Sequence, residues 1–536
     1  MKRFAWLVCA LVAACGDGEK PNNPADGQTT PDAPTSASLQ SIKNVVVIYA
    51  ENRGFDNIYG NFPNANGLPV APTTQVDRDG AVLTKLPKSW TGVTSAGFTP
   101  AIAEADSDNL PNAPYSLPTH YAAAQYDNSF ITRDLYHRFY ENQMQIDGGA
   151  NDMFAAYADS GGLVMGYNDG SAMALWKLAS EFTLADNFFM GAFGGSFLNH
   201  QYLICACAPE YPNADTSVAS GSISTLKLDA GKFTPYLTET VDSPPSALTG
   251  IPKFTLSGNL TPKSYFGDNT WRAVNTMQPP YQPSANAAAA ADTSKLYADT
   301  TKATTLPPQT QKTIGDQLTD KSVTWAWYSG AWQATLTEAM GAHNFPFPLP
   351  PGAVPNFQFH HQPFNYYSFL DPMDHADARA EHLKDETDLL ADITGGTLPA
   401  VTFYKPEGDL NQHSGYASVK AGDEHIADLV AKLQASPQYK DMLIIITYDE
   451  NGGWWDHVAP PFGDLLGPGT RIPAILVGPY VKTHYVDHTQ YDTGSIIRFI
   501  EKRFALPALP GITARDQGLA TNNEAPMGDF TSALQF

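Results

Sequence analysis

The sequence predicts an α/β fold in which a central, mostly parallel sheet is flanked by helices on both faces. Short aliphatic runs recur along the chain, and amphipathic stretches with helical spacing lie between them. Aliphatic runs without a polar face are typical of strands buried on both sides, and crossover helices supply that burial. A stretch rich in Pro, Ser, Thr, Ala and Asn, residues 209–313, interrupts the alternation. We interpret it as an irregular insertion that covers or borders the functional site.

Five aliphatic or β-branched runs are predicted to be strands of this sheet. They are Asn44–Tyr49, Val323–Tyr328, Ala400–Lys405, Met442–Tyr448 and Pro473–Gly478. Two stretches with apolar residues at helical spacing are predicted to be helices, namely Asp423–Ser436 and Thr493–Ala505. This alternation predicts one large sheet with crossover helices.

The first residues are typical of an export signal. Two basic residues precede an apolar run that is too short to span a bilayer. The run ends in Val12–Gly16, which resembles a bacterial lipobox with Cys15 as the lipid-bearing residue; an ordinary signal peptide cleaved nearby is the alternative. We expect a lipoprotein signal peptide over residues 1–14 and a flexible, polar tether over residues 15–42. The expected location is the cell envelope, periplasm or outer membrane, after secretion across the inner membrane.

Composition limits the classes of function. The 32 basic and 55 acidic residues give a formal charge of −23, which argues against a nucleic-acid-binding surface. An anionic substrate would therefore need local positive charge, most economically a metal ion. With 536 residues, 43% of them hydrophobic, the chain can bury a large core. The sequence does not indicate an oligomeric state.

The cysteines do not form a disulfide framework. Cys9 lies in the apolar run and Cys15 is the expected lipid-bearing residue, which leaves Cys205 and Cys207. The spacing of these last two residues allows either a disulfide or two buried thiols.

Pairs of polar residues follow two of the predicted strands. Glu51 and Asn52 follow the first run, and Asp449 and Glu450 follow the run Met442–Tyr448. Ligands collect at the carboxyl ends of parallel strands, and carboxylates that meet there repel each other unless a cation lies between them. The pairs therefore predict a metal site; a solvated strand end or a helix cap is the alternative for either pair alone.

Several motifs together resemble a bacterial phosphoesterase family that includes acid phosphatases of the AcpA type and phosphatidylcholine-cleaving phospholipases C. The resemblance extends from Lys43 to about Leu506 and is weakest in the insertion. It is carried by VVVIYAENRGFDNIYG, TIGDQLTDKSVTWAWYSGAW, HSGYA, IITYDENGGWWDHVAPP and GPGTRIPAILVGPYVK. It implies an alkaline-phosphatase-like fold and a phosphoesterase catalytic domain over residues 43–536.

The resemblance also implies a nucleophile and a set of metal ligands. In FGGSFLNHQYL the position of the family's nucleophile is held by Ser196. Physically, two glycines would let the backbone approach a phosphate, and a helix that begins here would direct free N–H groups at an anion; a simple helix N-cap is the alternative. The implied metal ligands are Glu51, Asn52, Ser196, Asp449 and Glu450. Their oxygen atoms suit a hard divalent ion, Ca²⁺, Mg²⁺ or Mn²⁺.

Histidines complete the implied site. The resemblance assigns active-site positions to His137, His360, His361 and His413. We expect protonated histidines to offset charge on the phosphoryl oxygens and one histidine, or its bound water, to protonate the leaving alcohol; which one does so is open. His200 is a weaker candidate on the same helical face as Ser196, and His457 receives no role.

The function implied by the resemblance is metal-dependent hydrolysis of phosphate monoesters through a phosphoserine, as in an acid phosphatase. The nucleophile segment SFLNH lacks the T-x-P-N-R pattern of the phospholipases C, and the chain ends soon after IIRFIEKRFALPALPG. The alternative is a phospholipase C that cleaves phospholipid head groups, since an enzyme anchored at a membrane through Cys15 would meet them. A third possibility is a non-catalytic surface-binding lipoprotein. The expected partners are therefore phosphorylated small molecules or lipids.

Overall fold

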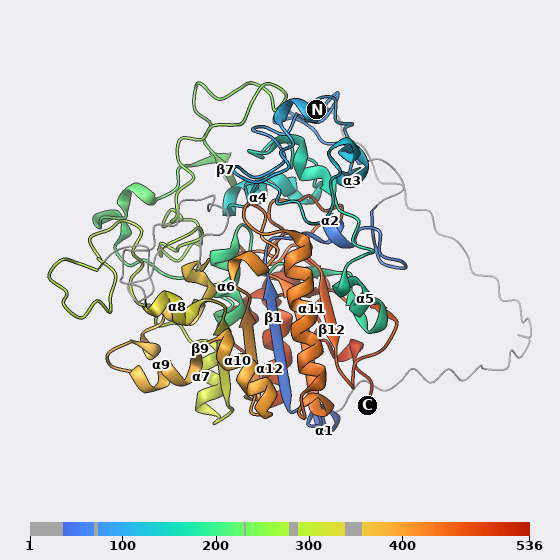
Figure 1. Cartoon of the computed structure of the whole chain (residues 1–536). Helices are drawn as coiled ribbons and strands as arrows, with labels where there is room; N and C mark the ends of the chain where they lie inside the picture. The colour runs from blue at the N-terminus through green and yellow to red at the C-terminus, as the bar shows by residue number, and fades with distance from the viewer. Residues whose placement is uncertain (1–35, 69–72, 230–231, 278–287, 338–355) are drawn as a thin grey trace, which may run out of the picture. The chain divides into compact units, whose positions relative to one another are not determined.

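The central sheet has eight strands in the order β13-β4-β12-β11-β1-β10-β8-β9. Figure 1 shows β1, β9 and β12 of this sheet. The computed structural model describes residues 36–68, 73–229, 232–277, 288–337 and 356–536. The strands of the sheet are β1 (Asn44–Ala50), β4 (Thr183–Ala185), β8 (Trp325–Ser329), β9 (Leu383–Asp385), β10 (Val401–Lys405), β11 (Met442–Tyr448), β12 (Ala474–Val477) and β13 (Tyr485–Asp487). Neighbouring strands are parallel except on either side of β12. The predicted α/β fold with a mostly parallel sheet is confirmed.

All five predicted strands belong to this sheet, with ends that differ by at most two residues. The sequence did not indicate that β12 runs antiparallel to its neighbours β11 and β4. It also did not reveal β4, β9 and β13, because strands of three residues are too short to show a periodic pattern.

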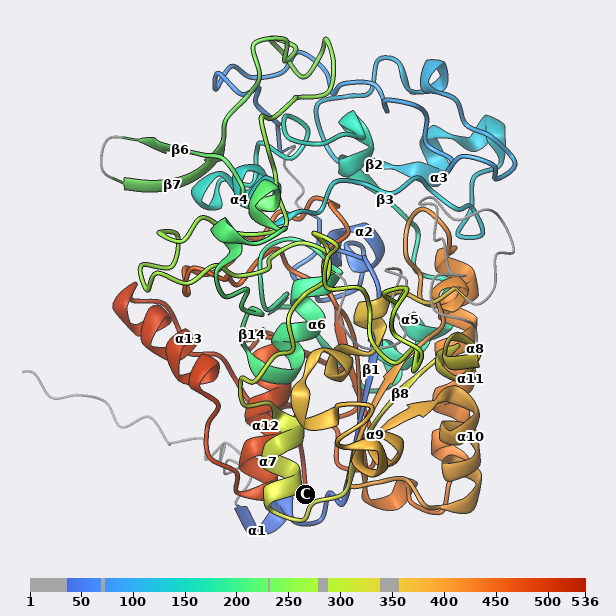
Figure 2. The same cartoon turned by 90° about the vertical axis from the view of Figure 1, so that its left-hand side faces the viewer.

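Helices cover both faces of the sheet (Figure 2). One face carries α10 (Glu386–Gly395) and α11 (Val419–Ala435), and the other carries α7 (Ile314–Asp320) and α12 (Gly494–Phe504) together with α6 (Ser196–Cys205). Helix α11 begins where the Ser418 side chain accepts a hydrogen bond from the Ala421 amide. Its apolar residues at helical spacing are buried against the sheet, as the amphipathic pattern predicts.

The remaining elements are short and lie mostly outside the central sheet. The helices are α1 (Ser36–Leu39), α2 (Phe55–Tyr59), α3 (Leu117–His120), α4 (Phe139–Ile146), α5 (Ala174–Glu181), α8 (Trp332–Thr337), α9 (Ala376–His382) and α13 (Pro510–Thr521). The small sheets pair β2 (Tyr115–Ser116) with β3 (Gly166–Tyr167), β5 (Phe188–Phe189) with β14 (Tyr491–Asp492), and β6 (Leu226–Asp229) with β7 (Lys232–Leu237). Of the helices in the described residues, none has both the length and the apolar character that crossing a membrane requires.

The predicted insertion is mostly irregular where the structure describes it. Its regular elements in the described part of 209–313 are the hairpin β6–β7 and two single 3-10 turns. One of its loops, Val274–Thr276, lines a cavity at the carboxyl ends of the sheet strands. The predicted signal peptide and Cys15 lie outside the described residues. At the end of the predicted tether, Leu39 and Ile42 are buried in the core.

Candidate active site

The two polar pairs predicted from the sequence lie side by side at one edge of the sheet. Strands β1 and β11 are parallel neighbours, and Ala50 pairs with Tyr448, the last residue of β11. The Asp449 amide then donates a hydrogen bond to the Ala50 carbonyl. Because the two strands end in register, the residues that follow them begin at the same point along the edge of the sheet. The side chains of all four polar residues are fully buried: Glu51, Asn52, Asp449 and Glu450.

Asp449 is held by the backbone and leaves one oxygen free. Its Oδ1 accepts hydrogen bonds from the amides of Asn52, at 3.1 Å, and Glu450, at 2.8 Å. Among the described residues its Oδ2 has no hydrogen-bond partner, and Nδ1 of His200 lies 3.7 Å from it. A buried carboxylate oxygen without a partner is costly, so this atom is a candidate ligand for a cation.

The charges at this edge are not balanced by neighbouring arginines. Burial, with the charge of Glu51 adding to it, raises the pKa of Asp449 to about 7. Burial and the charge of Asp449 likewise raise the pKa of Glu450 well above its usual range. Carboxyl groups with such shifts favour a proton or a metal ion between them.

Ser196 is the first residue of α6 and faces this edge. Its hydroxyl lies 3.2 Å from Asn52 Oδ1 and 3.5 Å from Glu450 Oε1. The N-cap position is held by Gly195, and Ser196 makes no capping hydrogen bond, so the N-cap alternative does not describe this residue. A side chain at Gly195 would place its Cβ 2.9 Å from the His137 carbonyl oxygen, which explains the glycine.

Glu51 is tied to the protein through both carboxylate oxygens. Its Oε1 lies 2.8 Å from Nε2 of His361 and 2.9 Å from Nζ of Lys405. Its Oε2 accepts hydrogen bonds from Asn411, at 2.7 Å, and Tyr416, at 2.9 Å. Burial raises the pKa of this carboxyl group, but Lys405 and His361 outweigh burial and hold the pKa well below its usual range. Glu51 is therefore ionised and fixed in orientation.

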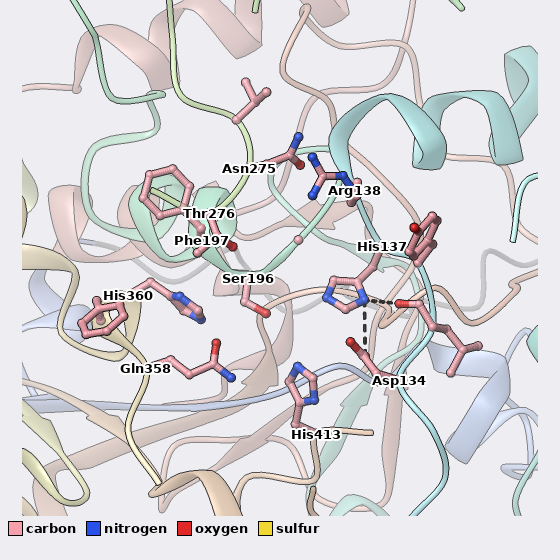
Figure 3. Close-up of a pocket in the computed structure, with 15 residues that line it drawn as sticks. Asp134, His137, Arg138, Ser196, Phe197, Asn275, Thr276, Gln358, His360 and His413 are labelled. Carbon is pink, nitrogen blue, oxygen red and sulfur yellow. Dashed lines mark hydrogen bonds and ion pairs between the residues drawn. The ribbon is translucent and has the colours of Figure 1, made fainter. Parts of the chain in front are cut away.

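Three of the four predicted histidines surround Ser196 in one cavity of about 380 Å³ (Figure 3). His137, His360 and His413 line it, and Nε2 of His137 lies 3.7 Å from Glu450 Oε1. His361 does not line the cavity but contacts Glu51 from behind. His360 lines the cavity and its Nε2 also lies 3.8 Å from Glu51 Oε1, so among the four predicted histidines only His361 contacts this carboxylate without facing the cavity.

Burial keeps these histidines neutral. It lowers the pKa of His137 and of His360, and it lowers the pKa of His361 and of His413 to about 3. The positive histidines expected from the sequence are therefore not favoured in the ligand-free site. A neutral imidazole still donates one hydrogen bond, and an arriving dianion would favour protonation.

Sequence reasoning missed several residues of the site. Asp134 lines the cavity with its Oδ1 at 3.6 Å from His137 Nδ1. Gln358 and Arg138 also line the cavity, although the Arg138 guanidinium is engaged with Ser257 and Glu141. Lys405 is the last residue of the predicted strand Ala400–Lys405, and this position at a strand end was the one feature of the sequence that could have identified it as a site residue.

The remaining candidates have structural contacts. His200 Nδ1 lies 2.8 Å from the Ser196 carbonyl oxygen, which places its ring beneath the start of α6. His457 Nδ1 lies 2.7 Å from Asp56 Oδ2, away from Ser196. Cys205 and Cys207 are joined by a disulfide at the other end of α6, which decides between the two alternatives for this pair.

The donor set at the strand ends fits a hard divalent cation. Its carboxylate, amide and hydroxyl oxygens would be supplied by Glu51, Asn52, Ser196, Asp449 and Glu450. The fit rests on the partnerless oxygen of Asp449 and on the raised pKa values of the β11 pair. Oxygen ligands alone do not choose between Ca²⁺, Mg²⁺ and Mn²⁺.

Comparison with known proteins gives partial matches to phospholipases C. The chain is 29% identical over 174 residues to phospholipase C B of Mycobacterium tuberculosis, covering 28% of this chain and 32% of that protein. It is 29% identical over 175 residues to the non-hemolytic phospholipase C of Burkholderia pseudomallei, covering 28% and 24%. The matches thus span about a third or less of these relatives. A solved alkaline phosphatase superfamily protein from Vibrio parahaemolyticus is 12% identical, with a TM-score of 0.28 over 66% of this chain and 65% of that chain.

The family model covers far more of the chain. The model of the Phosphoesterase family matches residues 42–507, a range that includes both strand-end pairs, Ser196 and all four predicted histidines. The chain belongs to the Phosphoesterase family.

Proposed function

We propose that this protein hydrolyses phosphate monoesters through a phosphoserine intermediate on Ser196, as an acid phosphatase. Hydrolysis of phosphoric esters agrees with its family. The observation that carries the proposal is the position of the Ser196 hydroxyl, which begins a helix, contacts Asn52 and Glu450, and opens into the cavity. A hydroxyl there can meet a phosphoryl group and the polar strand-end residues at the same time.

The start of α6 favours an anion in front of Ser196. The first N–H groups of a helix have no partner within it, and the helix dipole places partial positive charge there. The cavity adds the imidazole of His360, which donates one N–H when neutral. The Nδ1–H groups of His137 and His413 donate to the Leu135 and Ser414 carbonyls, so these two rings would donate to the phosphate only once protonated. The phosphoryl oxygens would therefore be oriented by backbone and side-chain donors of this chain.

A divalent ion held by the strand-end oxygens would supply electrostatic stabilisation to the Ser196 oxygen and to the phosphoryl group. The residues that would hold it are those of the fitted donor set. The chain's own residues position the nucleophile and donate hydrogen bonds to the phosphoryl oxygens.

Two displacements complete the proposed reaction. The Ser196 hydroxyl passes its proton to the Glu450 carboxylate as its oxygen attacks phosphorus and the ester P–O bond breaks, and the leaving alcohol takes a proton from protonated His413 or from water bound to it. The Nδ1–H of His413 donates to the Ser414 carbonyl and orients the ring, so the proton that His413 gives to the leaving alcohol is one taken up when the phosphate dianion binds. Water then attacks the phosphoserine, which releases phosphate and restores Ser196.

A phospholipase C is the second candidate function. The named relatives are phospholipases C, and this is the observation that favours it. The same nucleophile and cavity would then act on a diester between a head group and a lipid. A surface lipoprotein that only binds its ligand remains a third candidate.

Substrate preference tests all three candidates. Purified protein is assayed with p-nitrophenyl phosphate, bis-p-nitrophenyl phosphate and phosphatidylcholine, each over a range of pH, with Ser196→Ala as the blank. Preference for the monoester supports the phosphatase, and preference for the diester or lipid supports the phospholipase C. The absence of turnover on every ester contradicts both enzymes and favours the binding protein.

The proposed location depends on lipid attachment at Cys15, as the lipobox resemblance suggests. Wild-type protein should partition into membranes, and Cys15→Ser should not be processed as a lipoprotein while keeping its activity. A soluble wild type whose mature N-terminus lies beyond Cys15 contradicts the anchor without affecting the proposed reaction.

A further inference from the structure

A buried lysine lies inside the strand-end site. Lys405 is the last residue of β10, which is the parallel neighbour of β1 on the side away from β11. Its side chain is fully buried, and its Nζ lies 2.9 Å from Oε1 of Glu51. The site that would hold a cation therefore already contains one cationic group.

Glu51 does not depend on this lysine for its hydrogen bonds. Asn411 and Tyr416 donate to one of its oxygens, and His361 approaches the other. A lysine ammonium is costly to bury, and it repels a metal ion at short range. Because the buried ammonium is costly and the hydrogen bonds of Glu51 do not require it, we infer that Lys405 adjusts the net charge of the metal site.

Lys405 is the one lysine or arginine that contacts a candidate ligand carboxylate in the part of the chain that the structure describes. Arg53 is buried nearby, next in sequence to Asn52. Its guanidinium is directed at the Gln412 carbonyl and at Asn57 instead. Among the described residues, the side chains that approach the carboxylates of Glu51, Asp449 and Glu450 as possible ion-pair partners are thus histidines and Lys405.

We propose that Lys405 sets the charge of the site so that it accepts a single divalent ion. When a bound ion has displaced the protons of Asp449 and Glu450, these two carboxylates and Glu51 together with one ammonium carry two net negative charges, which one divalent ion neutralises. Lys405 is thus a selectivity residue that acts through Glu51. This inference rests on the metal site of the proposed function.

Removal of the ammonium would leave three negative charges at the same oxygen ligands. A trivalent ion would then gain more than a divalent ion, because the interaction energy scales with the charge of the ion. Lys405→Met keeps the length of the side chain and removes its charge. Lys384→Met is the matched control, because Lys384 lies on the edge strand β9 and pairs with Asp392 of α10.

The experiment is a calorimetric titration of the chelator-stripped full chain. Each variant is titrated with La³⁺ and with whichever of Ca²⁺, Mg²⁺ and Mn²⁺ binds the wild type most tightly. We expect one divalent ion per wild-type chain, and a ratio of La³⁺ to divalent affinity that rises at least about tenfold in Lys405→Met but not in Lys384→Met. An unchanged ratio in Lys405→Met, or two divalent ions at the wild-type site, overturns the proposal.

A double variant covers the case in which Lys405→Met does not fold. Lys405→Met/Glu51→Gln removes one charge of each sign, so its affinity ratio should return to the wild-type value; a ratio as high as that expected for the single variant contradicts the charge count. If the double variant also fails to fold, the number of divalent ions bound per wild-type chain tests the proposal, and two ions at the site contradict it. A wild type that binds no ion contradicts the metal site itself, whereas one ion with an unchanged ratio contradicts only the role of Lys405.

Discussion

Two buried carboxylate clusters come from the same two stretches of sequence. The strand-end cluster takes Glu51 from the residues after β1 and Asp449 and Glu450 from the residues after β11. The arginine cluster takes Asp56 from the first stretch and Asp456 from the second. All five carboxylates are buried, but only the arginine cluster contains a guanidinium.

The arginine cluster satisfies each of its oxygens. In Arg471, Nη2 lies 3.0 Å from Asp56 Oδ1 and Nε lies 3.0 Å from Asp456 Oδ1. His457 contacts the second oxygen of Asp56, and the Asp56 amide donates to the second oxygen of Asp456. Burial raises the pKa of Asp456 to about 6, with Arg471 opposing it. This cluster is a structural network that holds the two stretches together.

The difference teaches that burial alone does not identify a metal site. Both clusters are buried and both contain a histidine contact. The strand-end cluster is distinguished by the partnerless Asp449 Oδ2 and by the hydroxyl of Ser196 among its contacts. The incomplete counter-charge, in which Lys405 contacts Glu51 but no lysine or arginine among the described residues contacts Asp449 or Glu450, indicates a cation more than the number of acidic residues does.

The largest expected effect is on turnover at Ser196. Ser196→Ala should lose at least about a thousandfold in kcat with KM nearly unchanged, because only the covalent step is removed. Ser196→Thr should keep part of the rate. Ser418→Ala is the control, because Ser418 caps α11 and should cost about 1 kcal/mol of stability without affecting kcat. Near-wild-type turnover in Ser196→Ala would leave water as the attacking group.

Next in size is the loss of the counter-charge in the arginine cluster. Arg471→Met leaves Asp56 and Asp456 buried without their arginine counter-charge, so we expect about 3–5 kcal/mol less free energy of unfolding. Urea denaturation measures this loss. Activity per folded molecule should stay close to wild type, and a drop in it without a loss of stability would assign Arg471 to the active site.

The pH dependence of stability tests the unbalanced charge of the strand-end cluster. In metal-free protein the pKa of Asp449 is raised to about 7, so protonation favours the folded state. Its contribution is present below about pH 4 and is lost as the pH rises through 7, by up to about 1.4 kcal/mol per pH unit. Unfolding free energies of chelated wild type and Asp449→Asn should therefore converge as the pH falls. Parallel curves would show that Asp449 titrates normally.

The smallest expected effect belongs to His457. His457→Gln keeps a side-chain donor that can reach Asp56, so it should cost on the order of 1 kcal/mol and leave kcat unchanged. Thermal denaturation and a turnover assay check both values. A large loss of kcat with normal stability would move His457 from the arginine cluster to the reaction.

Much of the site could be predicted because strand ends carry a strong local signal. The aliphatic runs that become β1 and β11 stop abruptly at charged residues, so the positions of Glu51 and Asp449 follow from the fold class. The disulfide between Cys205 and Cys207 was one of two alternatives, because spacing alone does not report oxidation state.

The rest depends on packing that the sequence pattern does not encode. Lys405 reaches Glu51 because β10 pairs with β1, and strand order is a tertiary property. Asp134 reaches His137 from a loop without periodic structure. The neutral state of the histidines follows from burial, which a motif does not report.

The metal content of three purified proteins tests the central claim most directly. Wild type, Asp449→Asn and Asp456→Asn are equilibrated with Ca²⁺, Mg²⁺ and Mn²⁺, desalted, and measured by elemental analysis together with p-nitrophenyl phosphate turnover. The account predicts one ion per chain and activity in wild type and in folded Asp456→Asn, and loss of both in Asp449→Asn. A wild-type metal content and rate in Asp449→Asn would contradict a metal site at the ends of β1 and β11.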